Sequence, residues 1–146
     1  MTQRRSIVYL LLCYGFPNEL QELFRTLYHP ADHYIFHCDA KAPPALRGLI
    51  DAIAAGFPNV HRIEDRLCAW GGYSLVDATL RGIDHALDAI PHWSHFVPLS
   101  EQHRRTLIVP YPRRIAATAI AEVRRQKRVQ SEIGQRPLEW HKTDAL

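Results

Sequence analysis

Long hydrophobic runs are missing from this sequence of 146 residues. A membrane-spanning helix needs about 20 mostly apolar residues, whereas the longest candidate, residues 7–13, is only as long as a strand. Arg4 and Arg5 precede that run as basic residues do in a signal peptide, but residues 14–17 offer no small-residue cleavage site. We therefore interpret residues 7–13 as a buried first strand. We expect a cytoplasmic protein with no transmembrane segment, or one in peripheral contact with a membrane.

Cysteine is scarce, and the usual metal-binding motifs are absent. Cys13, Cys38 and Cys68 are odd in number and form no C-x-x-C pair, which favours reduced thiols over a disulfide framework or a zinc site. The nine histidines form no H-E-x-x-H motif, and no Asp-x-Asp is present to hold a cation on a diphosphate. His29, His33 and His37 recur at every fourth position but span a loop and a predicted strand, so they share no helical face. We predict no metal site.

Glycine-rich phosphate-binding motifs are also absent. The first predicted strand is followed by Tyr-Gly-Phe-Pro at residues 14–17, not by G-x-G-x-x-G, and no P-loop occurs. These absences exclude the dinucleotide-binding fingerprint and the P-loop NTPases.

Acidic residues are rare between residues 103 and 128, where eight Arg and Lys accompany a single Glu. Such a segment could bind nucleic acid or an anionic membrane. However, Ile115, Ala119 and Val123 form a narrow apolar stripe on a predicted helix over about 113–129, which more often means a helix resting on its own domain. We therefore expect no nucleic-acid partner, and a basic nucleic-acid-binding module is the less favoured alternative.

The remaining sequence alternates strands with helices. Apolar runs predict strands at residues 6–14, 33–39, 59–61 and 95–100, and apolar residues at helical spacing separate them. This order predicts an α/β domain with a mostly parallel sheet and flanking helices.

Residues 66–102 form the segment around which the rest is organised. Ser74 is a predicted N-cap, with Asp77 three residues later, and the helix it opens ends before Pro91. We expect this helix to bury one continuous stripe, which comprises Val76, Leu80, Ile83, Leu87 and Ile90.

Four blocks in the same order resemble the core-2/I-branching glycosyltransferase family, which includes the peptide O-xylosyltransferases. They read HYIFHCDAKAP, FPNV, WGGYSLVDATL and HFVPLS, and the resemblance covers about residues 5–102. It implies a GT-A-like, Rossmann-like nucleotide-sugar-binding domain. It also implies inverting transfer of N-acetylglucosamine or xylose from a UDP-sugar to an acceptor hydroxyl, such as that of a glycan, without a metal or other cofactor.

Five residues are predicted to bind the donor. Asp39 ends the second strand, where its carboxylate either contacts the nucleotide or caps a turn; the resemblance favours the nucleotide. Trp70 and Tyr73 either stack on the uracil or pack on the rim of the sheet, and Gly71 admits either a close ligand approach or a simple turn. Tyr14, at the end of the first strand, is placed near the nucleotide by analogy of fold alone.

The resemblance weakens after Ser100. The family continues with Gly-Gln-Asp, whereas this sequence reads Glu101-Gln-His-Arg-Arg. The family's catalytic glutamate comes from a later segment, so we do not assign Glu101 as the catalytic base, and the catalytic residue stays unknown. We predict two regions: residues 1–102 as the nucleotide-sugar-binding domain, and 103–146 as a divergent basic helix and tail. The alternative function is an incomplete, non-catalytic domain that binds a nucleotide or a partner.

Overall fold

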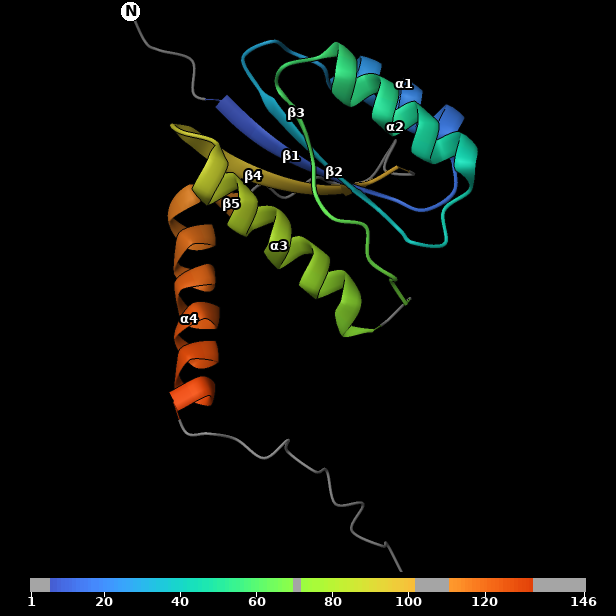
Figure 1. Ribbon diagram of the computed structural model, residues 1–146. Helices are drawn as coiled ribbons and strands as arrows, with labels where there is room; N and C mark the ends of the chain where they lie inside the picture. Colours follow the sequence, from blue (N-terminus) through green and yellow to red (C-terminus); the bar gives the residue numbers. More distant parts are fainter. Residues whose placement is uncertain (1–5, 70–71, 102–110, 133–146) are drawn as a thin grey trace, which may run out of the picture.

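The computed structural model describes residues 6–69, 72–101 and 111–132 (Figure 1). Strands and helices alternate through most of this chain, as the hydrophobic pattern predicts. The elements are β1 (Ser6–Cys13), α1 (Pro17–Leu27), β2 (His33–Cys38), α2 (Pro44–Gly56), β3 (Val60–Arg62), α3 (Tyr73–Ala89), β4 (Trp93–Ser100), β5 (Tyr111–Pro112) and α4 (Arg113–Glu132).

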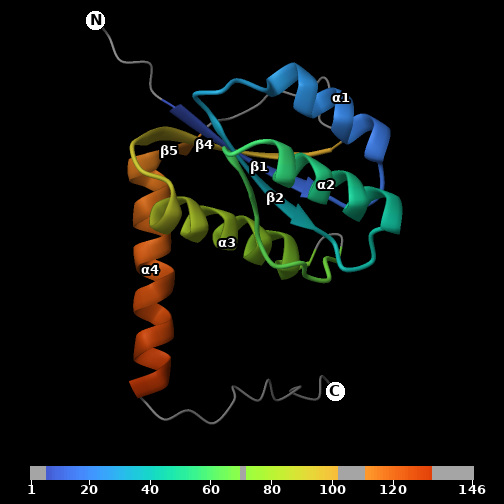
Figure 2. The ribbon, with the colours of Figure 1, turned by 45° about the horizontal axis from the view of Figure 1, so that its top comes forward.

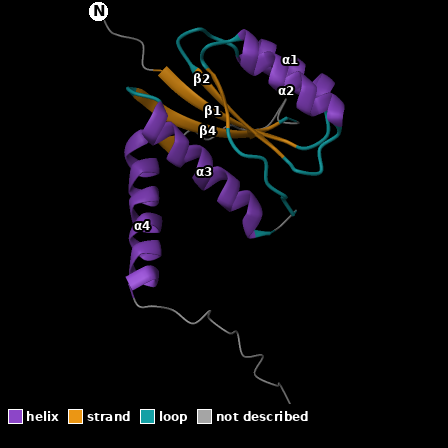
Figure 3. Ribbon diagram, in the orientation of Figure 1, coloured by secondary structure: helices purple, strands orange, loops and turns teal. Residues whose placement is uncertain are grey.

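The five strands form one sheet in the order β3-β2-β1-β4-β5. Figure 3 labels its neighbouring strands β2, β1 and β4. The first four are parallel, and the two-residue β5 runs antiparallel to β4. Crossover helices are what parallel neighbours require, because the chain must return to the same end of the sheet. The predicted α/β fold with a mostly parallel sheet is therefore confirmed.

Helices cover both faces of the sheet (Figure 2). Leu11 and Cys13 of β1 join the core beneath α1 and α2, whereas Val8 and Leu10 join the core beneath α3 and α4. Because successive side chains on a strand point to opposite faces, a central strand covered on both sides must be apolar throughout. This explains the continuous apolar run at residues 7–13.

Helix α3 differs from its sequence prediction at its start. It begins at Tyr73 with Gly72 as its N-cap, and the Ser74 hydroxyl instead accepts a hydrogen bond from the Ala69 N–H at 2.8 Å. The predicted N-cap at Ser74 is therefore wrong.

The buried face of α3 also differs from the predicted stripe. Val76 is 51% exposed, although Ile83 and Ile90 are buried as predicted. Small residues, which a scan for large apolar side chains overlooks, form much of the contact with the sheet: Ala78, Gly82 and Ala86.

Helix α4 rests on its own domain through a stripe that is shifted by one residue from the prediction. Ala116 and Ile120 are buried in the core beside β4 and α3, whereas Ile115 is exposed. Arg124 adds ion pairs to Asp84 and to Asp88 of α3. Within the described parts of the chain, no helix combines the length and apolar character needed to cross a membrane.

Gly82 provides a test of how closely α3 packs on the sheet. A Cβ atom at Gly82 would lie 2.9 Å from both terminal carbons of the fully buried Leu10. We expect Gly82→Ala to lower the free energy of unfolding by about 1–3 kcal/mol, because overpacking outweighs the better helix propensity of alanine.

Gly48 in α2 is the matched control. A Cβ atom there would meet nothing within 4 Å, so Gly48→Ala should raise the free energy of unfolding by up to about 1 kcal/mol. Urea denaturation of both variants measures the two effects. Equal stabilisation by the two substitutions would show that α3 does not pack tightly on Leu10.

Candidate functional site

A pocket of about 380 Å³ opens at the carboxyl ends of the parallel strands. Strands β1, β2 and β4 bring their last residues to this edge, because they are neighbours in register. In open α/β sheets, ligands bind at this edge. The loop before α3 and the first turns of α3 complete the wall, and the lining includes Leu12, Cys13, Tyr14, His37, Asp39, Lys41, Cys68, Leu75, Pro98, Leu99 and Ser100.

Asp39 lines this pocket and is only 6% exposed. Its backbone N–H donates to the Cys13 carbonyl at 2.8 Å, so the residue is fixed beside the end of β1. Its Oδ1 accepts a hydrogen bond from the Lys41 N–H at 2.8 Å, which is the turn-forming role considered from sequence. The turn and the pocket position coexist, so the nucleotide role of Asp39 stays a prediction.

Tyr14 follows β1 and also lines the pocket. Its ring packs edge-on against Phe16, with ring centroids 5.5 Å apart. Burial, with a smaller contribution from the Glu101 carboxylate, raises the pKa of the Tyr14 phenol. The side chain is therefore a neutral hydroxyl that can both donate and accept a hydrogen bond at physiological pH.

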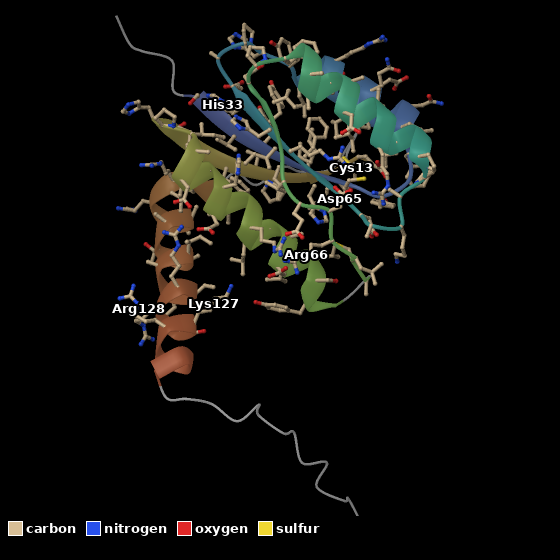
Figure 4. The ribbon with its side chains drawn as sticks, viewed as in Figure 1. Cys13, His33, Asp65, Arg66, Lys127 and Arg128 are labelled. Atoms are coloured by element: carbon tan, nitrogen blue, oxygen red, sulfur yellow. The ribbon has the colours of Figure 1, made fainter. Side chains whose placement is uncertain are left out.

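Of the other three predicted donor residues, the structure describes only Tyr73. Trp70 and Gly71 lie outside the described residues. Tyr73 is 70% exposed and lines a second hollow, of about 280 Å³, between α3 and α4. Arg66 and Lys127 line the same hollow (Figure 4). The donor-stacking role of Tyr73 stays a prediction.

Three polar residues in the pocket were not predicted from the sequence to bind the donor. His37 and Lys41 flank Asp39 at two residues on either side, and Ser100 ends β4. The signal was present for His37 and Lys41, since both lie within the matching block HYIFHCDAKAP that contains Asp39. His37 is 1% exposed, and its burial lowers its pKa, so the imidazole is neutral at pH 7.

Glu101 is fully buried, at 0% exposure, directly after β4. Its Oε1 accepts hydrogen bonds from the backbone N–H groups of Tyr14 at 3.0 Å, Gly15 at 2.6 Å and Phe16 at 3.0 Å. The side chain does not line the pocket. From the sequence, Glu101 was not assigned as the catalytic base. In the structure its carboxylate accepts hydrogen bonds from the turn after β1.

Three histidines gather at the opposite end of the sheet from the pocket, although not the three that recur in sequence. His33, His61 and His85 come from β2, β3 and α3, and Nε2 of His85 lies 3.3 Å from Nδ1 of His61. Figure 4 shows His33 at one end of the sheet and Cys13 at the other. Within residues 6–69, 72–101 and 111–132, no group of His, Cys, Asp or Glu is arranged to hold a metal ion. All three cysteines are free and buried.

Fold and pocket together define an α/β domain with a largely apolar pocket, which also holds a few polar side chains, at the carboxyl ends of its strands. The sequence model of one family, the Core-2/I-Branching enzymes, matches residues 7–103. This match covers most of the chain, and the chain belongs to the Core-2/I-Branching enzyme family. The resemblance seen in the sequence is thereby confirmed.

Individual relatives carry the names of sugar transferases. The chain is 30% identical over 96 residues to a xylosyltransferase of Ciona intestinalis, covering 64% of this chain and 11% of the relative. It is 28% identical over 93 residues to human beta-1,3-galactosyl-O-glycosyl-glycoprotein beta-1,6-N-acetylglucosaminyltransferase 3, covering 62% and 21%. A bovine herpesvirus 4 protein of the same enzyme name is 25% identical over 92 residues, with the same coverage. The chain thus spans only 11% to 21% of the length of these relatives.

The group of His33, His61 and His85 predicts that the folded protein becomes less stable in acid. Burial lowers the pKa of His33, His61 and His85, and the two other rings lower that of His61 further. The nearby carboxylates of Asp32, beside His33, and of Asp84 and Asp88, beside His85, offset this only in part. A histidine whose folded pKa is lowered binds fewer protons folded than unfolded, so stability is lost as pH falls below the unfolded pKa of about 6.5.

We therefore expect the melting temperature of the wild type to decrease as the pH is lowered from about 7.5 to about 5.5. The decrease should be smaller in His61→Gln, because that variant has one titrating ring fewer. Circular dichroism melts across this range measure the change. An identical slope in the variant would rule out His61 as a contributor.

Proposed function

We propose that this chain forms the donor-binding part of a glycosyltransferase and that its strand-end pocket binds the nucleotide of a UDP-sugar. The observation that carries the proposal is the position of Asp39 and Tyr14, two residues predicted from sequence, in one pocket at the carboxyl edge of the sheet. Membership of the Core-2/I-Branching family supports the choice of a sugar donor.

The pocket residues suggest how the nucleotide is held. The Asp39 carboxylate accepts hydrogen bonds from the base or the ribose, and Tyr14 offers an aromatic wall with a hydroxyl. Lys41, on the turn after β2, supplies a positive charge toward the diphosphate. Trp70, Gly71 and Tyr73 complete the donor site by resemblance to the family.

The reaction we propose is transfer of N-acetylglucosamine or xylose to an acceptor hydroxyl with inversion and without a metal. A general base would take the proton from that hydroxyl as it attacks the anomeric carbon and UDP leaves. Among the described residues, Asp39 is the only carboxylate that lines the pocket, and it is bonded to the turn beside it. This arrangement favours donor binding over a complete catalytic centre in the described region. A non-catalytic domain that binds a nucleotide or a partner is therefore the second candidate.

Calorimetric titration of the purified chain with UDP tests the proposal. We expect binding that persists in EDTA and that Asp39→Asn weakens about tenfold or more, since a hydrogen bond to a charged group contributes about 1.5–3 kcal/mol. Asp88→Asn is the control, because Asp88 is an exposed aspartate near the end of α3 and does not line the pocket. No binding by folded wild-type protein would overturn the proposal.

Two additions to this titration refine it. Tyr73→Ala separates the predicted stacking role from the observed position in the hollow between α3 and α4: a loss of affinity supports stacking, and unchanged affinity excludes it. Hydrolysis or transfer from a UDP-sugar by the same preparation would count against the non-catalytic candidate.

A further inference from the structure

The Glu101 carboxylate links two segments that are 85 to 87 residues apart in sequence. Its backbone N–H donates to the Leu12 carbonyl at 3.3 Å, which continues the pairing of β4 with β1. Its side chain then reaches the turn between β1 and α1, where one oxygen receives three consecutive N–H groups.

These three N–H groups lie in the turn that leads from β1 into α1. Phe16 is the N-cap residue and makes no side-chain capping hydrogen bond, and Pro17 follows it. Of the three donors only Phe16 stands at the helix end, so Glu101 does not cap the first turn of α1 but holds the residues that lead into it. Glu101 therefore supplies, from the end of β4, one acceptor for three consecutive N–H groups of this turn.

Steric requirements at Gly15 do not explain the conformation of this turn. A Cβ atom at Gly15 would meet nothing within 4 Å, and its backbone does not adopt the left-handed conformation that favours glycine. We therefore attribute the conformation of this turn to its three hydrogen bonds with Glu101. Tyr14, the first of the three donors, is also the residue that the turn presents to the pocket.

We propose that Glu101 is a positioning residue for the donor pocket: its buried carboxylate holds residues 14–16 and so fixes the Tyr14 wall. This inference rests on the proposed function, because the ligand of the pocket is taken to be the nucleotide of a UDP-sugar. The role differs from general-base catalysis, since Glu101 lies outside the pocket lining and its Oε1 is occupied by the three N–H groups.

Amide spectroscopy tests the contact itself. In ¹H–¹⁵N spectra we expect the Gly15 amide proton to resonate downfield and the amides of residues 14–16 to be protected from hydrogen exchange in the free protein. Glu101→Gln should move the Gly15 resonance upfield and speed exchange at the three positions, because hydrogen bonds to a charged acceptor are about twice as strong as neutral ones. Exchange of these amides at solvent rates in the folded wild type would overturn the proposal.

UDP titration tests the consequence for the pocket. We expect Glu101→Gln to weaken UDP binding about five- to tenfold, because the amide oxygen of glutamine accepts weaker hydrogen bonds from residues 14–16 than a carboxylate does. Gly15→Ala, which keeps all three N–H groups, should bind as the wild type does. If Glu101 acts through Tyr14, its substitution should have no further effect in a Tyr14→Ala background. Fully additive losses would show that Glu101 contributes only general stability.

The two proposals fail differently. Absence of UDP binding by the wild type would overturn the proposed function and this role with it, whereas equal binding by wild type and Glu101→Gln would overturn this role alone. Thermal melts establish that each variant is folded at the titration temperature. If Glu101→Gln does not fold, Glu101→Asp takes its place: it keeps the charge but withdraws the carboxylate by one methylene group, and the same comparisons apply.

Discussion

The parallel pairing of β1 with both β2 and β4 is the constraint on which the rest of this structure depends. The register places Cys13 opposite Cys38 and Leu12 opposite Ser100, so three strands end at one line across the sheet. The residues that follow these strands, Tyr14, Asp39 and Glu101, are then neighbours although the sequence separates them widely. Each of them contacts the pocket or the turn that forms its wall. A shift of one residue in this register would turn the apolar side chains of β1 to the opposite faces and separate the polar ends.

Burial of β1 on both faces explains why the polar chemistry is confined to the strand ends. Most side chains of β1 are apolar because helices cover both sides, so the polar groups of the pocket lie mainly near the ends of the strands. Close packing of α3 on Leu10 through Gly82 brings this helix near the sheet, and Leu75 in its first turns reaches the pocket. The same packing that stabilises the domain therefore also encloses one side of the site.

Much of the fold could be predicted from the sequence because its signals are local. The apolar run of β1, the helical spacing in α1 and the strand ending at Asp39 each follow from periodicity within ten or so residues. The start of α3 and the inward faces of α3 and α4 could not be predicted in this way. At Gly82 and Ala116 the contact face is chosen by how closely a backbone can approach the sheet, which depends on the partner strand and not on the hydrophobicity of the helix residue.

The same distinction, between local sequence signals and contacts made only in the folded chain, applies to the residues of the site. Asp39 and Tyr14 could be placed from sequence because the carboxyl edge of a parallel sheet is where ligands bind, whatever the ligand. The role of Glu101 could not, since it depends on the three-dimensional closeness of the end of β4 and the turn after β1. A carboxylate in a polar stretch gives no local sign that it will be buried under three N–H groups.

Charge distribution further limits what the described region can do. The basic excess that the sequence shows near its end is partly balanced in the folded chain: Arg124 pairs with Asp84 and Asp88, and Arg125 pairs with Glu122. These cations therefore offer less to a polyanion than their number suggests, which weakens the case for nucleic acid. Within the described residues, Lys41 is the cation that lines the pocket. Stabilisation of developing charge is often the largest catalytic effect, and a single flexible lysine gives a departing diphosphate little of it. The described pocket therefore agrees better with the proposed donor binding than with a complete catalytic centre.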